Sequence, residues 1–130
     1  MKQPPLANAE LAVMKRLWEE DRLTARHIRE QLYPNKTKAQ HGTVQRLLQR
    51  LEDKDYVNRD RSLPVHLFSA KIDRQTYARN QLESLAAKLT GGSLAPLITY
   101  LVEGKKLSPK ELSRLRAILD EHRAKEDHND

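Results

Sequence analysis

The stretch with the clearest chemical pattern is residues 40–51, which read QHGTVQRLLQRL. On a helix of 3.6 residues per turn, its apolar side chains fall on one stripe and its hydrogen-bonding side chains on the opposite face. An arginine can pair with guanine, a glutamine with adenine, and a threonine with a phosphate or a thymine methyl group. The pattern is therefore typical of a helix that reads the major groove of DNA, and equally of an ordinary solvated amphipathic helix. The stripe consists of Val44, Leu47, Leu48 and Leu51, and the polar face of Thr43, Arg46, Gln49 and Arg50.

The charge distribution favours the DNA-binding alternative. Residues 34–50 contain four basic residues and no acidic one. The chain of 130 residues carries a net charge of +6, and most of that excess lies in residues 1–72, which hold 14 basic and 9 acidic side chains. A positive surface attracts polyanions, although solvated lysines and arginines are the commoner reason for a modest excess. We therefore expect a nucleic-acid partner for the first half of the chain.

Two shorter helices are predicted to support the polar one. The first is expected over residues 8–20 with Asn8 as its N-cap, and the second ends at residue 32 and is capped by Thr24. Pro34 then breaks the chain, because proline disfavours helical geometry in the residue before it and donates no backbone hydrogen bond. The third helix begins near Lys38. Two helices joined by such a tight break are typical of a helix-turn-helix.

The segment after the third helix is predicted to be a β-hairpin, or wing. Strands are expected at residues 56–59 and 65–69, because β-branched and aromatic residues flank a polar tip that contains a proline. Arg59 and Arg61 lie on this hairpin, where they could reach a phosphate or the minor groove; two merely solvated arginines are the alternative. The predicted DNA-binding residues are Lys38, Thr43, Arg46, Gln49, Arg50, Arg59 and Arg61.

The second half is predicted to be helical and to join two copies of the chain. Helices are expected at residues 74–89, at residues 94–102 after a Ser93 cap, and from Pro109 onward after a capping box of Ser108 and Glu111. The middle helix has almost no polar face, so a second copy is its expected cover. We therefore expect a DNA-binding domain at 1–72 and a dimerisation domain at 73–130. The predicted dimer interface consists of Leu94, Leu97, Ile98, Leu101, Val102, Leu112, Leu115, Ile118 and Leu119.

Five short motifs lie along the chain in a characteristic order and spacing. They consist of Leu6, Glu10, Val13, Met14, Leu17 and Trp18, of Thr24, Ala25 and Ile28, of Thr43, Val44, Leu47, Leu48, Arg50, Leu51 and Lys54, of Gly91, Gly92 and Ser93, and of Leu107, Ser108, Glu111, Leu112, Leu115 and Leu119. Together these motifs resemble those of the penicillinase-repressor (BlaI/MecI) family of winged-helix transcriptional repressors. The resemblance covers nearly the whole chain.

The resemblance implies a mainly α-helical fold with a small β-wing, and a homodimer that represses genes by binding a palindromic operator. The genes implied are those of β-lactam resistance or another stress response. A membrane sensor protease releases the best-known members after cleavage at an Asn-Phe bond, but the corresponding residues 98–102 read ITYLV and contain no such bond. The copper-responsive branch ends in paired cysteines. This chain has no cysteine, which excludes copper sensing through thiolates.

No enzyme class fits the sequence. The five histidines fall on different predicted elements without the i, i+4 spacing of a metal-binding pair, and there is no Gly-rich phosphate loop or nucleophile elbow. We therefore expect no catalytic site, no metal and no cofactor. The N-terminus lacks the apolar run of a signal peptide, so a cytoplasmic protein without membrane insertion is expected. An adaptor that uses a winged helix for protein contacts is the alternative function.

Overall fold

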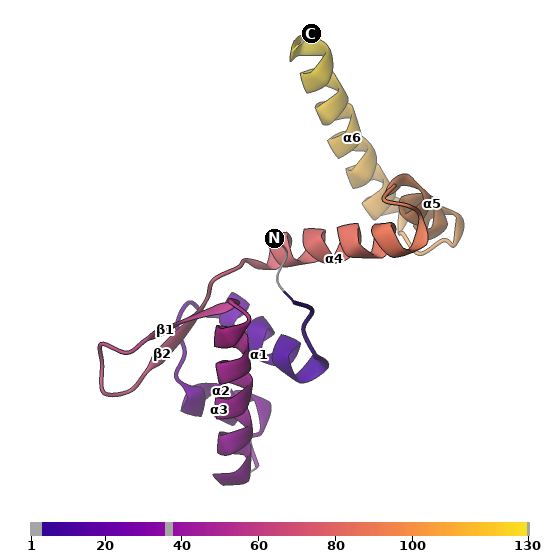
Figure 1. Cartoon of the computed structure of the whole chain (residues 1–130). Helices are drawn as coiled ribbons and strands as arrows, with labels where there is room; N and C mark the ends of the chain where they lie inside the picture. Colours follow the sequence, from indigo (N-terminus) through magenta and orange to yellow (C-terminus); the bar gives the residue numbers. More distant parts are fainter. Residues whose placement is uncertain (1–3, 36–37, 130) are drawn as a thin grey trace. The chain divides into compact units, whose positions relative to one another are not determined.

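The protein is described by a computed structural model that covers residues 4–35 and 38–129, with the side chains of residues 4–35 and 40–127. It divides into two compact units, residues 1–80 and residues 81–130. The predicted fold class, mainly α with a small two-stranded antiparallel sheet, is confirmed. The elements, labelled in Figure 1, are α1 (Asn8–Glu19), α2 (Ala25–Leu32), α3 (Lys38–Asp53), β1 (Val57–Asp60), β2 (Leu67–Ala70), α4 (Arg74–Leu89), α5 (Ala95–Glu103) and α6 (Pro109–Asn129).

The helices α1 and α2 begin with different kinds of cap. The N-cap of α1 is Ala7, so the prediction that Asn8 caps this helix is wrong. Alanine offers no side-chain acceptor for the N–H groups of the first turn. The Glu10 carboxylate, three residues on, accepts the backbone N–H of Ala7 at 2.8 Å, which is the second of the two bonds of a capping box. The predicted Thr24 cap of α2 is confirmed, since its hydroxyl oxygen accepts the N–H of His27 at 3.1 Å.

The core of the first unit is centred on the apolar stripe of α3. Each of the four predicted stripe residues is at most 5% exposed, which confirms the helical period read from the sequence. Side chains from α1, α2 and the hairpin pack around the stripe, which removes apolar surface from water and is the main favourable term in folding. The buried residues of this cluster include Val13, Met14, Leu17, Ile28, Val44, Leu47, Leu48, Leu51, Tyr56 and Phe68.

The beginning of α4 belongs to the first unit because its Tyr77 packs against two aromatic side chains of that unit, Trp18 and Tyr56. The Trp18 ring centroid lies 5.7 Å from that of Tyr77, and Tyr77 also meets Tyr56 edge-on at 6.0 Å. The Trp18 indole N–H donates to the backbone oxygen of Ile72 at 2.9 Å. The compact units therefore part after residue 80, within α4. The predicted division of functions at residue 73 stays a prediction.

A tight turn carries the chain from α3 into the hairpin. The N–H of Tyr56 donates to the oxygen of Leu51 at 2.9 Å and the N–H of Asp55 to that of Glu52 at 3.0 Å, the hydrogen-bond pattern of a Schellman motif. Asp55 has φ 69°, the left-handed conformation that this motif requires. Because only three residues separate α3 from β1, the strand starts beside the end of the helix.

The hairpin pairs Val57 with Ala70 and Asp60 with Leu67, so the strands lie one or two residues from the predicted bounds. Leu23, in the connector between α1 and α2, adds a bridge to Phe68 through backbone hydrogen bonds of 3.0 and 2.8 Å. This bridge joins β2 of the hairpin to the helical part of the unit. We call β1, β2 and the loop between them the wing.

The second unit consists of helices with little core of their own. Among residues 81–127, Ala86 is the only buried side chain. Gly91 and Gly92 end α4 at φ values of 65° and 101°, as expected of glycines after a helix. The N-cap of α5 is Leu94 and makes no side-chain bond, so the prediction of a Ser93 cap is wrong.

The observed start of α6 agrees with the start predicted from the sequence. The Ser108 hydroxyl oxygen accepts the N–H of Glu111 at 3.1 Å, and a Glu111 carboxylate oxygen accepts the N–H of Ser108 at 3.0 Å. These two bonds confirm the predicted capping box. In the part of the chain that the structure describes, every helix is too short or too polar to cross a membrane.

Candidate nucleic-acid interface

The outer face of α3 carries the predicted base-reading residues. Because the apolar stripe is buried, residues on the opposite side of the helix must face solvent. Arg46, Gln49 and Arg50 are exposed, and Thr43 is partly exposed. A guanidinium nitrogen of Arg46 donates to the hydroxyl oxygen of Thr43 at 3.4 Å. The backbone of Lys38 begins α3, and its side chain lies outside the described residues.

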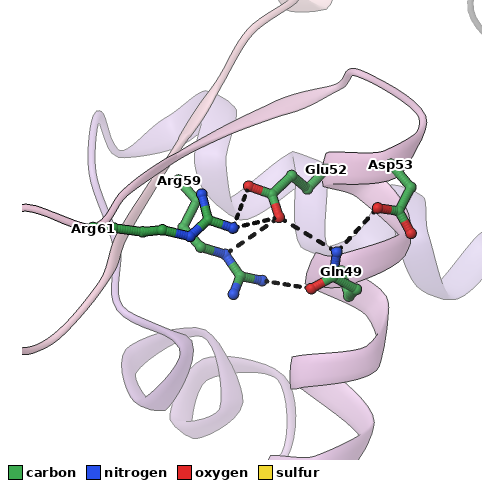
Figure 2. Close-up of polar contacts among 5 residues, drawn as sticks. All are labelled: Gln49, Glu52, Asp53, Arg59 and Arg61. Carbon is green, nitrogen blue, oxygen red and sulfur yellow. Dashed lines mark hydrogen bonds and ion pairs between the residues drawn. The ribbon is translucent and has the colours of Figure 1, made fainter.

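The two predicted arginines of the wing have different environments (Figure 2). The Arg59 guanidinium lies 4.7 Å from the centroid of the buried Phe68 ring, and only 12% of its side chain is exposed. Its Nη2 donates to Gln49 Oε1 at 3.5 Å. The Arg61 side chain is 55% exposed, and its Nη2 lies 2.9 Å from Glu52. Arg59 is therefore a structural link between wing and helix, whereas Arg61 is a mostly exposed side chain paired with Glu52.

Two acidic residues at the end of α3 complete this group, and they were absent from the predicted interface. The Gln49 amide nitrogen donates to Asp53 at 3.0 Å and to Glu52 at 3.4 Å, as Figure 2 shows. Two arginines and two carboxylates leave the group with no formal net charge. The sequence contains a sign of it, because Glu52 is the first acidic residue after the acid-free residues 34–50. The pairing of Glu52 with two arginines further along the chain depends on the left-handed turn at Asp55.

The far part of the wing is organised by Asp60. Its carboxylate accepts the hydroxyl of Ser62 at 2.6 Å and the N–H of Ser62 at 2.9 Å. These hydrogen bonds, with a smaller contribution from nearby Arg22 and His66, hold the pKa of Asp60 below its ordinary value. This carboxylate is therefore charged at neutral pH and places a negative group at the end of β1.

An open pocket of about 290 Å³ lies between the first turn of α2, one side of α3 and the wing. Its polar lining comes from all three elements, with His41 and Gln45 of α3 in contact at 3.3 Å. The sequence could not group these side chains because they meet only in the folded unit. Within the described residues, no cluster of three or more histidine or acidic side chains is arranged to hold a metal ion. The polar residues that line the pocket are Thr24, Arg26, His41, Gln45 and His66.

Comparisons with known proteins give one consistent result. Residues 6–121 match a family model described as penicillinase repressor. The chain is 28% identical over 122 residues to the penicillinase repressor of Bacillus licheniformis, with 94% of each chain covered. It is 26% identical over 120 residues to the penicillinase repressor of Staphylococcus aureus, with 92% of this chain and 94% of the relative covered. Among solved structures it is similar to the DNA-binding domain of the repressor BlaI, with a TM-score of 0.50 and 29% identity over 58% of this chain and 92% of that domain.

Proposed function

The chain belongs to the penicillinase repressor family, and from this membership we propose that it is a sequence-specific DNA-binding repressor that acts as a homodimer on a palindromic operator. The observation that carries the proposal is the two-sided character of α3. Its apolar side is fully buried, and its opposite side presents arginine, glutamine and threonine to solvent. The likeness to the BlaI DNA-binding domain supports the same reading.

The proposed contacts divide into two kinds. Thr43, Arg46 and Gln49 lie on the outer face of α3 and are the candidates for reading base edges in the major groove. Lys38, Arg50 and Arg61 are the candidates for phosphate contacts, which fix the orientation of the protein but carry no sequence information. Arg59 contributes chiefly by holding the wing against α3, since its guanidinium is largely buried on Phe68.

The second unit supports the proposed homodimer. Eight of the nine predicted interface residues are 37–67% exposed in the single chain, and they lie on α6, on α5 or at its N-cap. Clusters of exposed large apolar side chains typically mark an interaction surface. A symmetric pair of these helices would present two copies of α3 to two half-sites of one duplex, so the operator would mirror the two-fold axis. Repression then follows from occupancy of the promoter.

The release mechanism remains part of the proposal. A membrane sensor protease is the candidate partner, and the regulated genes are those of β-lactam resistance or another stress response. The chain offers no Asn-Phe bond at residues 98–102, which form part of α5. Cleavage at that kind of bond is therefore not proposed at this position.

The experiment that tests DNA binding is a titration of the full chain against duplex DNA over a range of salt concentrations. We expect the logarithm of the binding constant to fall linearly with the logarithm of salt concentration, because each neutralised phosphate releases counterions. Fragments selected from genomic DNA should bind more tightly than mixed-sequence duplex. An adaptor protein that binds other proteins would show almost no salt-sensitive DNA affinity, and that result would overturn the proposal.

A further inference from the structure

Glu52 is the residue on which three side chains of the predicted DNA-binding set converge: those of Gln49, Arg59 and Arg61 (Figure 2). Its carboxylate lies 2.9 Å from Nη2 of Arg61, 3.6 Å from Nε of Arg59, and 3.4 Å from the amide nitrogen of Gln49. It lies near the C-terminal end of α3 and is 21% exposed. Glu52 is acidic, so it cannot itself attract a phosphate. It lies between two arginines that could attract a phosphate, so its effect on DNA binding must act through them.

The two arginines held by Glu52 differ in their freedom to move. Arg59 is 12% exposed, stacks on Phe68 and donates to Gln49, so leaving its place would break the stacking and the hydrogen bond together. Arg61 is 55% exposed, and its bonds to the carboxylate are those of a partly solvated ion pair. Such pairs are weak because water screens them. Of the two wing arginines, Arg61 is therefore the one that can change partner.

A carboxylate and a phosphate compete for the same guanidinium group. Both are anions that accept parallel N–H bonds from arginine, so Arg61 cannot satisfy Glu52 and a phosphate fully at once. On the basis of the proposed function, we propose that Glu52 is a positioning residue that holds Arg61 away from the DNA backbone on mixed-sequence duplex. While Arg61 is paired with Glu52, the wing neutralises one phosphate fewer than it would with Arg61 on the DNA backbone. Affinity for DNA that is not the operator is kept low in this way.

The variant Glu52→Gln tests the proposal, because it keeps the shape of the side chain and removes its charge. The probe is a mixed-sequence duplex, and the binding constant is measured for the full chain over a range of salt concentrations. We expect binding about three- to fivefold tighter than that of the unchanged protein, the size of one exposed ion pair. The plot of log affinity against log salt should become steeper by about 0.9, which corresponds to one additional neutralised phosphate.

Two further variants separate this role from a general effect of charge. Asp53→Asn removes a neighbouring negative charge whose described partner is Gln49, so it should leave the salt slope unchanged. Arg61→Ala should abolish the gain, so Glu52→Gln introduced into an Arg61→Ala protein should bind as Arg61→Ala does. The thermal unfolding midpoint of each variant shows that the first unit still folds.

The possible outcomes distinguish this inference from the proposed function. A steeper slope that depends on Arg61 supports it. An unchanged slope, weaker binding by Glu52→Gln, or a gain that persists without Arg61 would overturn it, while the DNA-binding role of the chain would stand. If the unchanged protein itself shows no salt-sensitive binding to the duplex, the proposed function fails and this inference fails with it.

Discussion

Nζ of Lys54 lies 2.8 Å from Oε1 of Glu10, and this ion pair joins two helical segments that are 44 residues apart in sequence. The Glu10 side chain is 2% exposed and also accepts the N–H of Ala7. Lys54 donates in addition to the backbone oxygen of Pro5 at 3.2 Å. The Glu10–Lys54 pair therefore attaches the start of α1, and the segment before it, to the end of α3.

The first prediction concerns the acid stability of this arrangement. Burial by itself raises the pKa of Glu10, but hydrogen bonds from Lys54 and Ala7 and the charges of Lys54 and Arg50 outweigh it and hold the pKa below the ordinary 4.5. A carboxylate with a lowered pKa in the folded state contributes stability that is complete above its unfolded pKa and disappears as pH falls through the folded value. The free energy of unfolding, measured with urea, should therefore fall with pH below about 4.5.

The variant Glu10→Gln isolates that contribution. It should cost about 1–3 kcal/mol at neutral pH, because Lys54 no longer has a charged partner, and the acid-dependent fall in stability should become shallower. Glu19→Gln is the matched control, since the Glu19 carboxylate is 52% exposed and pairs with Arg16 on the surface of α1. Equal pH profiles for the unchanged protein and Glu10→Gln would contradict the assigned role.

The second prediction separates the two arginines of the wing by their effect on stability. Arg59→Ala should lower the free energy of unfolding by about 1–2 kcal/mol, because it removes a cation–π contact with Phe68 and the packing of a long side chain. Arg61→Ala should cost less than about 0.5 kcal/mol, as expected of an exposed pair. Urea unfolding of the two variants measures the difference. Similar decreases from both would show that the burial of Arg59 contributes little.

The third prediction concerns the outer face of α3. Replacing Arg46 and Arg50 with alanine should abolish specific binding to operator fragments. The salt slope of the remaining non-specific binding should fall by about 0.9 for each phosphate that is no longer neutralised. Stability should change by less than about 0.5 kcal/mol, because both side chains are exposed. Lys15→Ala, an exposed change on α1, is the control and should leave binding nearly unchanged. A large drop in stability of the double variant would mean that these arginines are structural.

Features that depend on residues close in sequence could be predicted. The stripe of α3 follows from the helical repeat, and the caps by Thr24 and by Ser108 with Glu111 require only neighbours three residues apart. The Asn8 cap was wrong for a local reason: Asn8 is a preferred cap residue, but Glu10 lies three residues after Ala7 and meets its N–H there. Here a helix start was set by a residue inside the helix.

Features that depend on the path of the chain could not be predicted. Two arginines on a hairpin are typical of a phosphate-binding wing. Nothing in the spacing of Arg59 and Arg61 indicates that both side chains pair with Glu52 of α3. That arrangement requires the left-handed turn at Asp55, which an aspartate adopts only rarely. The pocket between α2, α3 and the wing was missed for the same reason. The charge of an interface therefore cannot be obtained by counting its basic residues alone, because acidic residues brought in by the fold must be counted as well.

The last prediction tests the proposed dimer. Ile98→Asp and Leu101→Asp each place a charge on the apolar helix α5. In the single chain Ile98 is 53% exposed and Leu101 is 48% exposed. Both variants should sediment as monomers and bind operator fragments more weakly, because a buried unpaired carboxylate is costly and a single winged helix reaches only one half-site. Thr99→Asp adds the same charge on another side of α5 and should remain dimeric. The helical content of the variants, measured by circular dichroism, should not change, and an unchanged dimer in both would reject this interface.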